Sequence, residues 1–388
     1  MQCFAKFWNR DEWNKGDAFN ARVQNSDEVW VFNNMVSWKN KVRKGPGCIQ
    51  KPMRSGPSLS DIGQLTLQKG QVVTLQAHNS AYSIISLVRN CKDELRQILN
   101  NHGAVLLRGF RAETPDILTV VVHSFGERPF QNQEETSPRT HLGEGVFTST
   151  EYPNEHAIEF HNECSYQNQV PQFIFMHCMQ AAKYGGYTRL ASCGDILQQL
   201  PVALFNRFRQ SGYIYERNYL PHTGLSWQQS LSLNSLDELK QYCDKENIEL
   251  LVTDDHRIRT RQKRPCVAIH PDTGKALWLN HCLFFHNLSV PAEYRQSLGT
   301  QAQWQFPFDT RFGDGQAIDA PTMELVKRLY EQNAISVQWQ PGDVLIFDNL
   351  SMAHARDSFE GERKLYLAMA KPVAWKDMEI HQDREVNA

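Results

Sequence analysis

The chain has 388 residues, of which 41% are hydrophobic and 22% charged, so it is long enough to bury a sizeable core. Its formal net charge of −2 argues against a generally basic nucleic-acid-binding protein, because phosphate binding needs a strong excess of positive charge. No segment has the apolar core of a signal peptide or the ~20 apolar residues of a membrane span. We therefore predict a globular cytoplasmic protein that does not enter membranes.

Taken in chain order, residues 1–75 are expected to form an N-terminal extension of unknown role, and residues 76–388 a single domain. Apolar residues recur at helical spacing over 81–100, and Asn101-His102-Gly103 then supplies a glycine-type stop. A buried strand follows at 104–107. Further helices are expected at 200–210, 235–246 and 322–332.

Short apolar strands recur between turn signals along the rest of the chain. We expect them at 173–176, 212–215, 266–269, 344–347 and 365–368. This texture is typical of a mainly β protein with a double-sheet jelly roll, also called a double-stranded β-helix, that carries helical insertions.

Two distant fragments contain residue types that bind ferrous iron. His161 and Glu163 lie at positions i and i+2, so on one β-strand both side chains would project from the same face. His354 would complete a set of two histidines and one carboxylate. Such a set occupies one face of an octahedral metal and leaves the other face for an organic co-substrate and dioxygen. A His-x-Glu pair alone more often belongs to a solvated strand face.

Two more polar residues make the iron interpretation stronger. Thr188 follows His161 by 27 residues, and Arg363 follows His354 by nine. A hydroxyl and a guanidinium are suited to hold the far carboxylate of a dicarboxylic acid whose other end chelates the metal. Gly342-Asp343 is expected to form a turn before the buried strand that delivers His354.

Several segments resemble the taurine-dioxygenase-like iron(II)/2-oxoglutarate oxygenases, and most closely their branch of syringomycin-type amino-acid hydroxylases. The resemblance covers about residues 98–372. The segments that carry it most clearly are His161-Asn162-Glu163-Cys164-Ser165-Tyr166, Gly185-Gly186-Tyr187-Thr188, Trp339-Gln340-Pro341-Gly342-Asp343 and the stretch from His354 to Arg363.

The resemblance implies a complete cofactor site. Iron(II) would be bound by His161, Glu163 and His354, and 2-oxoglutarate would be anchored by Thr188 and Arg363. With dioxygen as second co-substrate, such enzymes decarboxylate 2-oxoglutarate and remove hydrogen from a substrate carbon, which most often ends in hydroxylation. No catalytic side chain beyond the metal ligands is expected.

The carboxylate ligand departs from the wider pattern in an informative way. Most relatives have Asp at this position, whereas Glu163 matches the syringomycin-type branch and the clavaminate synthases. Halogenases of the superfamily have a small residue there, so that chloride can bind the metal; Glu163 therefore favours hydroxylation over chlorination. Lys364 follows Arg363, and the spacing of the anchoring arginine varies among relatives, but Arg363 remains our choice.

The remaining cysteines and histidines are given structural interpretations. The nine cysteines show no disulfide or zinc spacing, and Cys164 is expected to point away from Glu163 into packing. His270, His281 and His286 lie in or beside apolar segments. We interpret them as core histidines, or as neighbours of the iron site, in preference to a second metal site.

The substrate is the least certain part of the sequence-based interpretation. In the run from His256 to Arg264, alternate residues that include Arg259 and Arg261 share one strand face and could bind a substrate carboxylate. A charged, solvated edge strand is at least as good an interpretation. A basic stretch in the extension could bind a peptidyl carrier protein, since members of the resembled branch act on free or carrier-tethered amino acids, but a plain surface is favoured. It consists of Lys39, Lys41, Arg43, Lys44 and Lys51.

Three functions therefore compete. The favoured one is a hydroxylase of an amino acid or an amino-acid-derived compound in secondary metabolism. The same cofactor chemistry could instead end in desaturation, epimerisation or bond cleavage. The third is a non-catalytic jelly-roll binding protein, which the intact set of five site residues argues against. The sequence does not indicate an oligomeric state.

Overall fold

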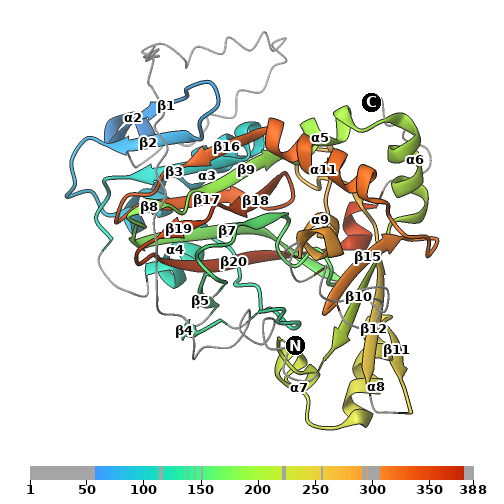
Figure 1. Cartoon of the computed structure of the whole chain (residues 1–388). Coiled ribbons are helices and arrows are strands. Elements are labelled where there is room, and N and C mark those ends of the chain that lie inside the picture. The colour runs from blue at the N-terminus through green and yellow to red at the C-terminus, as the bar shows by residue number, and fades with distance from the viewer. Residues whose placement is uncertain are drawn as a thin grey trace, which may run out of the picture.

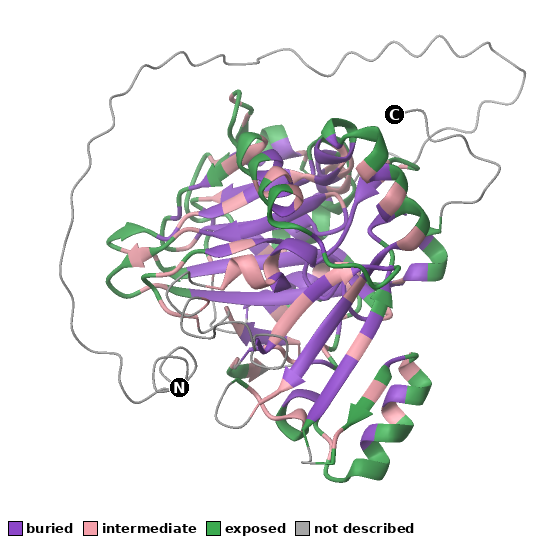
Figure 2. Ribbon diagram, turned by 45° about the vertical axis from the view of Figure 1, so that its right-hand side comes forward, coloured by how far each residue is buried: buried purple, intermediate pink, exposed green. Residues whose placement is uncertain are grey.

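The protein is built around two β-sheets that face each other (Figure 1). The computed structural model describes residues 57–379 except 113–116, 138, 144, 150–151, 221–223, 255–256, 291–294 and 296–305. Most strands of the two sheets are buried, and exposed residues gather on the helices and loops around them (Figure 2).

The larger sheet has eight strands and is antiparallel except where β2 runs parallel to β3. Its longest strands, β7 and β20, pair along nearly their whole length, and β17 lies on the other side of β7. In spatial order the strands are β1 (Gly63–Thr66), β2 (Val73–Ala77), β3 (Ala104–Arg108), β17 (Val344–Asp348), β7 (Gln169–Gln180), β20 (Lys364–Ala374), β5 (Val146–Thr148) and β4 (His141–Gly143).

The smaller sheet carries both histidines of the expected iron site. It runs β16 (Ala334–Val337), β9 (Thr188–Ser192), β18 (Met352–Arg356) and β6 (Ile158–His161). Apolar side chains from both sheets fill the space between them, for example Leu190 and Met352 from the smaller sheet and Phe347 and Met369 from the larger one. This arrangement confirms the predicted jelly roll.

Two helices cover the outer face of the larger sheet. α3 (Ile84–His102) and α4 (Ile117–Phe125) pack their apolar side chains against alternate residues of β3, β7 and β17. The expected stop of α3 is confirmed, because Gly103 adopts a left-handed φ of 76° and its N–H bonds to Leu99 O.

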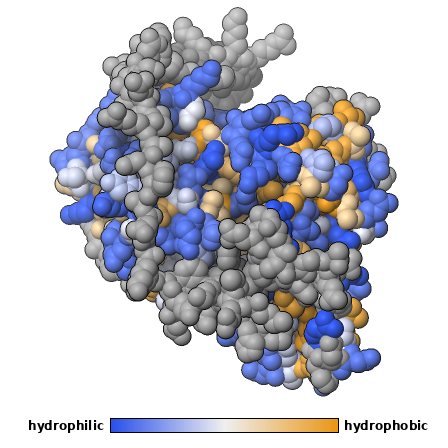
Figure 3. Space-filling view, viewed as in Figure 1, coloured by the Kyte–Doolittle hydropathy of each residue, from blue (hydrophilic) through white to orange (hydrophobic). Residues whose placement is uncertain are grey.

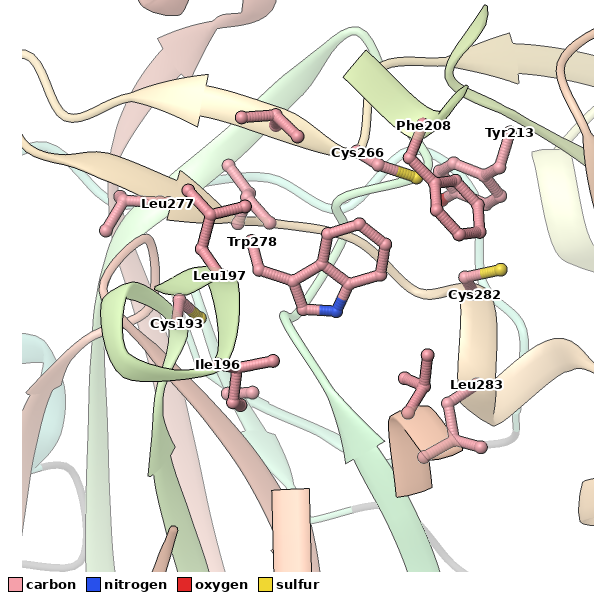
Figure 4. Close-up of a cluster of buried hydrophobic side chains, with 14 of the residues drawn as sticks. Cys193, Ile196, Leu197, Phe208, Tyr213, Cys266, Leu277, Trp278, Cys282 and Leu283 are labelled. Carbon is pink, nitrogen blue, oxygen red and sulfur yellow. The ribbon is translucent and has the colours of Figure 1, made fainter. Parts of the chain in front are cut away.

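A separate apolar cluster supports the far side of the smaller sheet. Trp278 lies at its centre, and Phe208 meets it edge-on at 4.9 Å between ring centroids (Figure 4). The cluster joins β13 (Val267–Ile269) and β14 (Ala276–Trp278) to four helices, and through α9 it fixes the residues beside the metal-ligand candidates. The helices are α5 (Cys193–Gln199), α6 (Val202–Ser211), α9 (Cys282–Phe285) and α11 (Ala320–Gln332).

A third sheet projects beside the jelly roll and carries its own small core under α8 (Figures 1 and 2). Its order is β11 (Glu249–Val252), β12 (Ile258–Arg264), β10 (Tyr213–Tyr219) and β15 (Phe308–Phe312), with α7 (Trp227–Leu231) and α8 (Leu236–Glu246) attached. The basic run thus lies on β12, an interior strand. The alternative of an edge strand guarded by charges is therefore wrong, because β12 is paired on both sides.

The expected helices and strands all occur within a few residues of their predicted bounds. The larger sheet extends back to β1, which follows the short helix α2 (Leu59–Ile62), and β2 spans the domain boundary expected after residue 75.

The basic stretch of the extension lies outside the described residues. The visible surface is mainly hydrophilic with patches of hydrophobic residues (Figure 3), and none of the helices described is long and apolar enough to cross a bilayer.

A short two-stranded sheet and two 3-10 turns complete the described elements. β8 (Tyr184–Gly185) pairs with β19 (Phe359–Glu360), and this pairing brings the Gly185-Gly186 segment close to Arg363. The 3-10 turns are η2 (Asn287–Ser289) and η4 (Trp375–Met378).

Candidate metal centre

The two histidines are brought together by strand pairing. His161 ends β6 and His354 lies in the middle of β18, and the two residues are directly opposite each other in the antiparallel register. Their rings lie 4.2 Å apart between centroids. Because opposite residues on one face of a strand pair have close side chains, residues 193 positions apart in sequence become neighbours.

Glu163 reaches the histidines from a turn and not from the strand, so the expectation of a shared strand face was wrong. β6 ends at His161, and Glu163 lies in the tight turn that follows. Asn349, in the turn between β17 and β18, holds the main chain of Glu163 at both ends: Glu163 N donates to Asn349 Oδ1 (2.8 Å), and Asn349 Nδ2 donates to Glu163 O (3.1 Å). One side-chain amide therefore couples the two fragments.

The three side chains form a compact buried group. Glu163 Oε2 lies 3.6 Å from His161 Nε2 and 3.7 Å from His354 Nε2. The candidate ligand atoms all lie within 4.8 Å of one another, and it is the one such group of three or more among the described residues. Two imidazole nitrogens and one carboxylate oxygen are the donor set of ferrous oxygenases.

The electrostatics favour the deprotonated forms of His354 and Glu163. Burial, and then the neighbouring His161, lower the pKa of His354 to about 3. Burial alone would raise the pKa of Glu163, but Arg139 and the two histidines outweigh it and hold that pKa well below its usual range. Neutral imidazole and ionised carboxylate are the forms that bind a cation.

Contacts around His161 fix its ring. Its Nδ1 lies 2.8 Å from Glu159 O; since a carbonyl only accepts, Nδ1 donates to it, and the ring presents Nε2 toward Glu163 and His354. His281 and Phe284 flank the ring at 4.6 and 4.9 Å between centroids. Burial lowers the pKa of His281 strongly, so this neighbour is neutral.

A residue not singled out from the sequence, Arg139, contacts Glu163. Its Nη2 lies 2.8 Å from Glu163 Oε1, and each of the two side chains is only 6% exposed. The carboxylate thus meets Arg139 through one oxygen and the histidines through the other. Arg139 belongs to a segment without regular periodicity, 22 residues before His161, and nothing in the sequence paired it with Glu163.

Thr188 begins β9 and is buried beside Trp339. Trp339 Nε1 donates a hydrogen bond to Thr188 Oγ1 at 3.0 Å. In the strand register Thr188 pairs with Arg356, two residues beyond His354. The hydroxyl therefore lies on the same sheet as both histidines.

Arg363 is a guanidinium without a carboxylate partner in the part of the chain that the structure describes. Its Nε donates to Gly186 O (3.0 Å), two residues before Thr188, and its side chain lies over Phe359. Burial, and then the nearby Arg356, lower the pKa of Arg363 to about 9. Among the residues that the structure describes, Arg356 donates hydrogen bonds to backbone carbonyls, those of Tyr152, Pro153 and His156. Two such cations favour an incoming anion.

The candidate substrate arginines make their described contacts within the third sheet. Arg259 Nε donates to Asn218 Oδ1 (2.7 Å). Arg261 Nε lies 2.6 Å from Glu216 Oε1, and the other oxygen of Glu216 accepts from Arg311 Nε at 3.2 Å. These contacts hold β10, β12 and β15 together, and they leave a substrate role of Arg259 and Arg261 as a prediction.

The other histidines and cysteines have structural surroundings. His270 contacts Asp348 (2.9 Å) and His286 contacts Ile318 O (3.2 Å), so they form no second metal group with His281 in the described residues. The seven described cysteines are buried and unbonded to one another. Cys164 is packed into the core between the sheets, as expected. It does not point away from Glu163, however: it adopts a left-handed turn conformation (φ 56°) and not a strand, and its Sγ lies 3.9 Å from Glu163 Oε1.

Comparison with known proteins agrees with this geometry. The model of a protein family described as "Taurine catabolism dioxygenase TauD, TfdA family" matches residues 76–369, which include His161, Glu163, Thr188, His354 and Arg363. The chain belongs to the TauD/TfdA family. It is a 2-oxoglutarate-dependent dioxygenase, with iron(II) as cofactor and 2-oxoglutarate and O2 as co-substrates.

Three similar proteins illustrate how this TauD/TfdA chain relates to others. Dapdiamide synthesis protein DdaC from Enterobacter agglomerans is 32% identical over 71% of this chain and 84% of its own length. A clavaminate synthase-like protein from Arabidopsis thaliana is 25% identical over 73% of this chain and 86% of its own. The solved structure of PvcB from Pseudomonas aeruginosa matches with a TM-score of 0.47 and 16% identity, covering 77% of this chain and 85% of that one.

Proposed function

We propose that this TauD/TfdA dioxygenase hydroxylates an unactivated carbon of an amino acid or amino-acid-derived small molecule. It would act in secondary metabolism and in the cytoplasm. Membership of the family carries the cofactor chemistry. The likeness to a protein named for dapdiamide synthesis, at 32% identity, supports a biosynthetic role, as does the resemblance of the site motifs to the syringomycin-type amino-acid hydroxylases.

We assign iron(II) to His161, Glu163 and His354. The observation that carries this proposal is the convergence of three buried donors from two distant fragments onto one point. When bound, the metal supplies the activation of dioxygen that is coupled to decarboxylation of 2-oxoglutarate. The donors leave one face of the metal for the two co-substrates, and Glu163 fills the position that a halide would need.

We assign the far carboxylate of 2-oxoglutarate to Arg363 and Thr188. Arg363 is a largely buried cation that lacks a carboxylate within the described residues, and a dicarboxylate would supply one. Its bond to Gly186 O keeps it beside the strand that begins at Thr188. The protein's task is then to orient the co-substrate and the target carbon, and no side chain need move a proton.

The substrate contacts are the least constrained part of the proposal. We keep Arg259 and Arg261 as candidates for a substrate carboxylate. Arg261 would have to exchange Glu216 for the substrate, since the two are already paired at 2.6 Å. A peptidyl carrier protein that delivers a tethered amino acid also remains a proposal, because the basic stretch expected to bind it lies outside the described residues.

The test is an anaerobic titration of metal-free protein with iron(II) and then 2-oxoglutarate. We expect the weak visible charge-transfer band that arises when a 2-oxo acid chelates ferrous iron. Amino acids are then screened for those that stimulate succinate formation and gain one oxygen atom, by mass spectrometry. Absence of the band in folded, iron-loaded protein would contradict the site assignment, and product that has lost two hydrogens would replace hydroxylation by desaturation.

A further inference from the structure

The two oxygens of the Glu163 carboxylate face different partners. Oε2 faces the two histidines, at 3.6 and 3.7 Å from their Nε2 atoms. Oε1 faces Arg139, whose Nη2 lies 2.8 Å away. The ion pair therefore uses the oxygen that the metal position does not need, and it is compatible with a metal bound between Oε2 and the histidines.

We propose that Arg139 is a positioning residue that restricts Glu163 to binding iron through one oxygen only, and so keeps a metal position open for the co-substrates. This inference rests on the proposed function, in which Glu163 is a ligand. Three protein donors leave three octahedral positions, of which chelated 2-oxoglutarate takes two and dioxygen one. A carboxylate that bound through both oxygens would occupy the position that dioxygen requires.

The charge and burial of the pair make the restriction effective. Both side chains are 6% exposed, so little water competes for Oε1. A charge-assisted bond from a planar guanidinium is strong and directional in such surroundings.

The chain just before Arg139 is anchored by the third sheet, which gives that sheet a role at the metal centre. The carbonyl of Glu135 accepts from Arg217 Nη1 (3.0 Å) on β10 and from Ser230 Oγ (2.6 Å) on α7. The carboxylate of Glu134 accepts from Gln262 Nε2 on β12 at 2.5 Å. Arg139 follows four residues after these anchored positions.

A second anchor comes from the turn that carries Glu163 itself. Tyr166 OH donates to Glu134 O at 2.8 Å, and Tyr166 lies three residues after Glu163. The segment with Arg139 and the turn with Glu163 are therefore bound to each other as well as to the third sheet. This double anchoring is what a positioning role requires, because the ion pair is placed by the surrounding fold and not only by its own attraction.

The test compares Arg139→Met and Arg139→Lys with the wild type and with Arg96→Met. Arg96 on α3 forms an ion pair with Glu127 (2.5 Å), two residues after α4, in a different part of the fold. This pair is more exposed than that of Arg139, and Arg96→Met serves as the control for the loss of an arginine ion pair. Each protein is titrated anaerobically with iron(II) alone, and the iron-saturated protein is then titrated with 2-oxoglutarate while the charge-transfer band is recorded.

We expect Arg139→Met to weaken iron(II) binding by about 10- to 100-fold, the usual effect of losing a partner that orients a metal ligand. The iron-saturated variant should also bind 2-oxoglutarate about tenfold more weakly and show a displaced band, because the second carboxylate oxygen now competes for the metal. Arg139→Lys should recover part of both losses, and Arg96→Met should match the wild type.

Each outcome separates this inference from the proposed function. If the wild type gives no band, the proposed function fails. If the wild type gives the band and folded Arg139→Met reproduces both of its titrations, the positioning role is overturned and Arg139 is a structural ion pair. Should Arg139→Met not fold, infrared difference spectra of manganese(II)-loaded wild type decide: carboxylate stretches of a one-oxygen ligand support the inference, and those of a two-oxygen ligand overturn it.

Discussion

The indole N–H of Trp339 donates to the hydroxyl oxygen of Thr188 at 3.0 Å, and both side chains are buried. An indole nitrogen can only donate, so the threonine oxygen must accept, and the hydroxyl hydrogen is then directed elsewhere. If Thr188 binds the far carboxylate of 2-oxoglutarate, Trp339 is the residue that turns its hydroxyl into a donor for that carboxylate.

We therefore predict that Trp339→Phe, which keeps an aromatic ring but removes the N–H, weakens 2-oxoglutarate binding by about 5- to 10-fold. Thr188→Val should have a similar effect. Because both changes remove the same bond, the double variant should be less affected than the product of the two single effects. Anaerobic titration of the iron-loaded proteins with 2-oxoglutarate measures all three affinities. Independent, multiplying effects would show that Trp339 does not act through Thr188.

Removal of either histidine should eliminate the metal centre. We predict that His161→Ala and His354→Ala each abolish the charge-transfer band and succinate formation, because each leaves the proposed site with a single imidazole donor, whereas removal of Glu163 would keep both. His123→Ala, at an exposed position on α4, is the matched control and should behave as the wild type. Unchanged titrations in either of the first two variants would contradict the iron assignment.

Removal of the Glu163 carboxylate should create a site that binds an anion, and not only an empty metal position. In Glu163→Gly the guanidinium of Arg139 would lose its partner at 2.8 Å and remain buried beside the metal position. We expect chloride to bind there and to shift the charge-transfer band of the 2-oxoglutarate complex. The shift should grow with the chloride concentration, and chloride-free sulfate buffer of equal ionic strength should not reproduce it.

The double variant Glu163→Gly, Arg139→Met tests the cause of that effect. It has the same open position without the buried positive charge, so its chloride response should be at least tenfold weaker. Equal responses in the single and double variants would show that the metal alone attracts the halide.

How far the sequence predicts this protein depends on whether a feature is local. The strands and helices were predictable because apolar periodicity is local, and His161 and His354 because their neighbours spell motifs of one family. The placement of Glu163 in a turn was not predictable. A two-residue spacing from His161 fits a strand as well as a turn, and the shape of this turn is fixed by Asn349, 186 residues away. The family motifs singled out Glu163, but the strand expected to carry it was wrong.

The interactions that depend on strand pairing were also beyond the sequence. Arg261 meets Glu216 because they are directly opposite in the pairing of β10 with β12, and this pairing makes β12 an interior strand. Arg139 meets Glu163 because the third sheet anchors the segment before it. Neither contact has a signal within a short window of sequence, since each depends on the register of strands that are distant along the chain.

The buried neutral histidines predict how the metal-free protein responds to acid. Burial lowers the pKa of His354 to about 3 and that of His286 to about 4, against about 6.5 in an unfolded chain. Between these values the unfolded state binds protons that the folded state cannot, so stability is full above pH 6.5 and is lost as the pH falls from about 6.5 toward 4.

Lowering the pH from 7.5 to 5.5 should cost about 1 kcal/mol of unfolding free energy for each such histidine. Urea denaturation of metal-free protein at the two pH values measures the loss, and His286→Gln, which removes one titrating group that is not a proposed metal ligand, should reduce it by about that amount. A stability that is unchanged, or that rises toward pH 5.5, would contradict the lowered pKa values of His354 and His286.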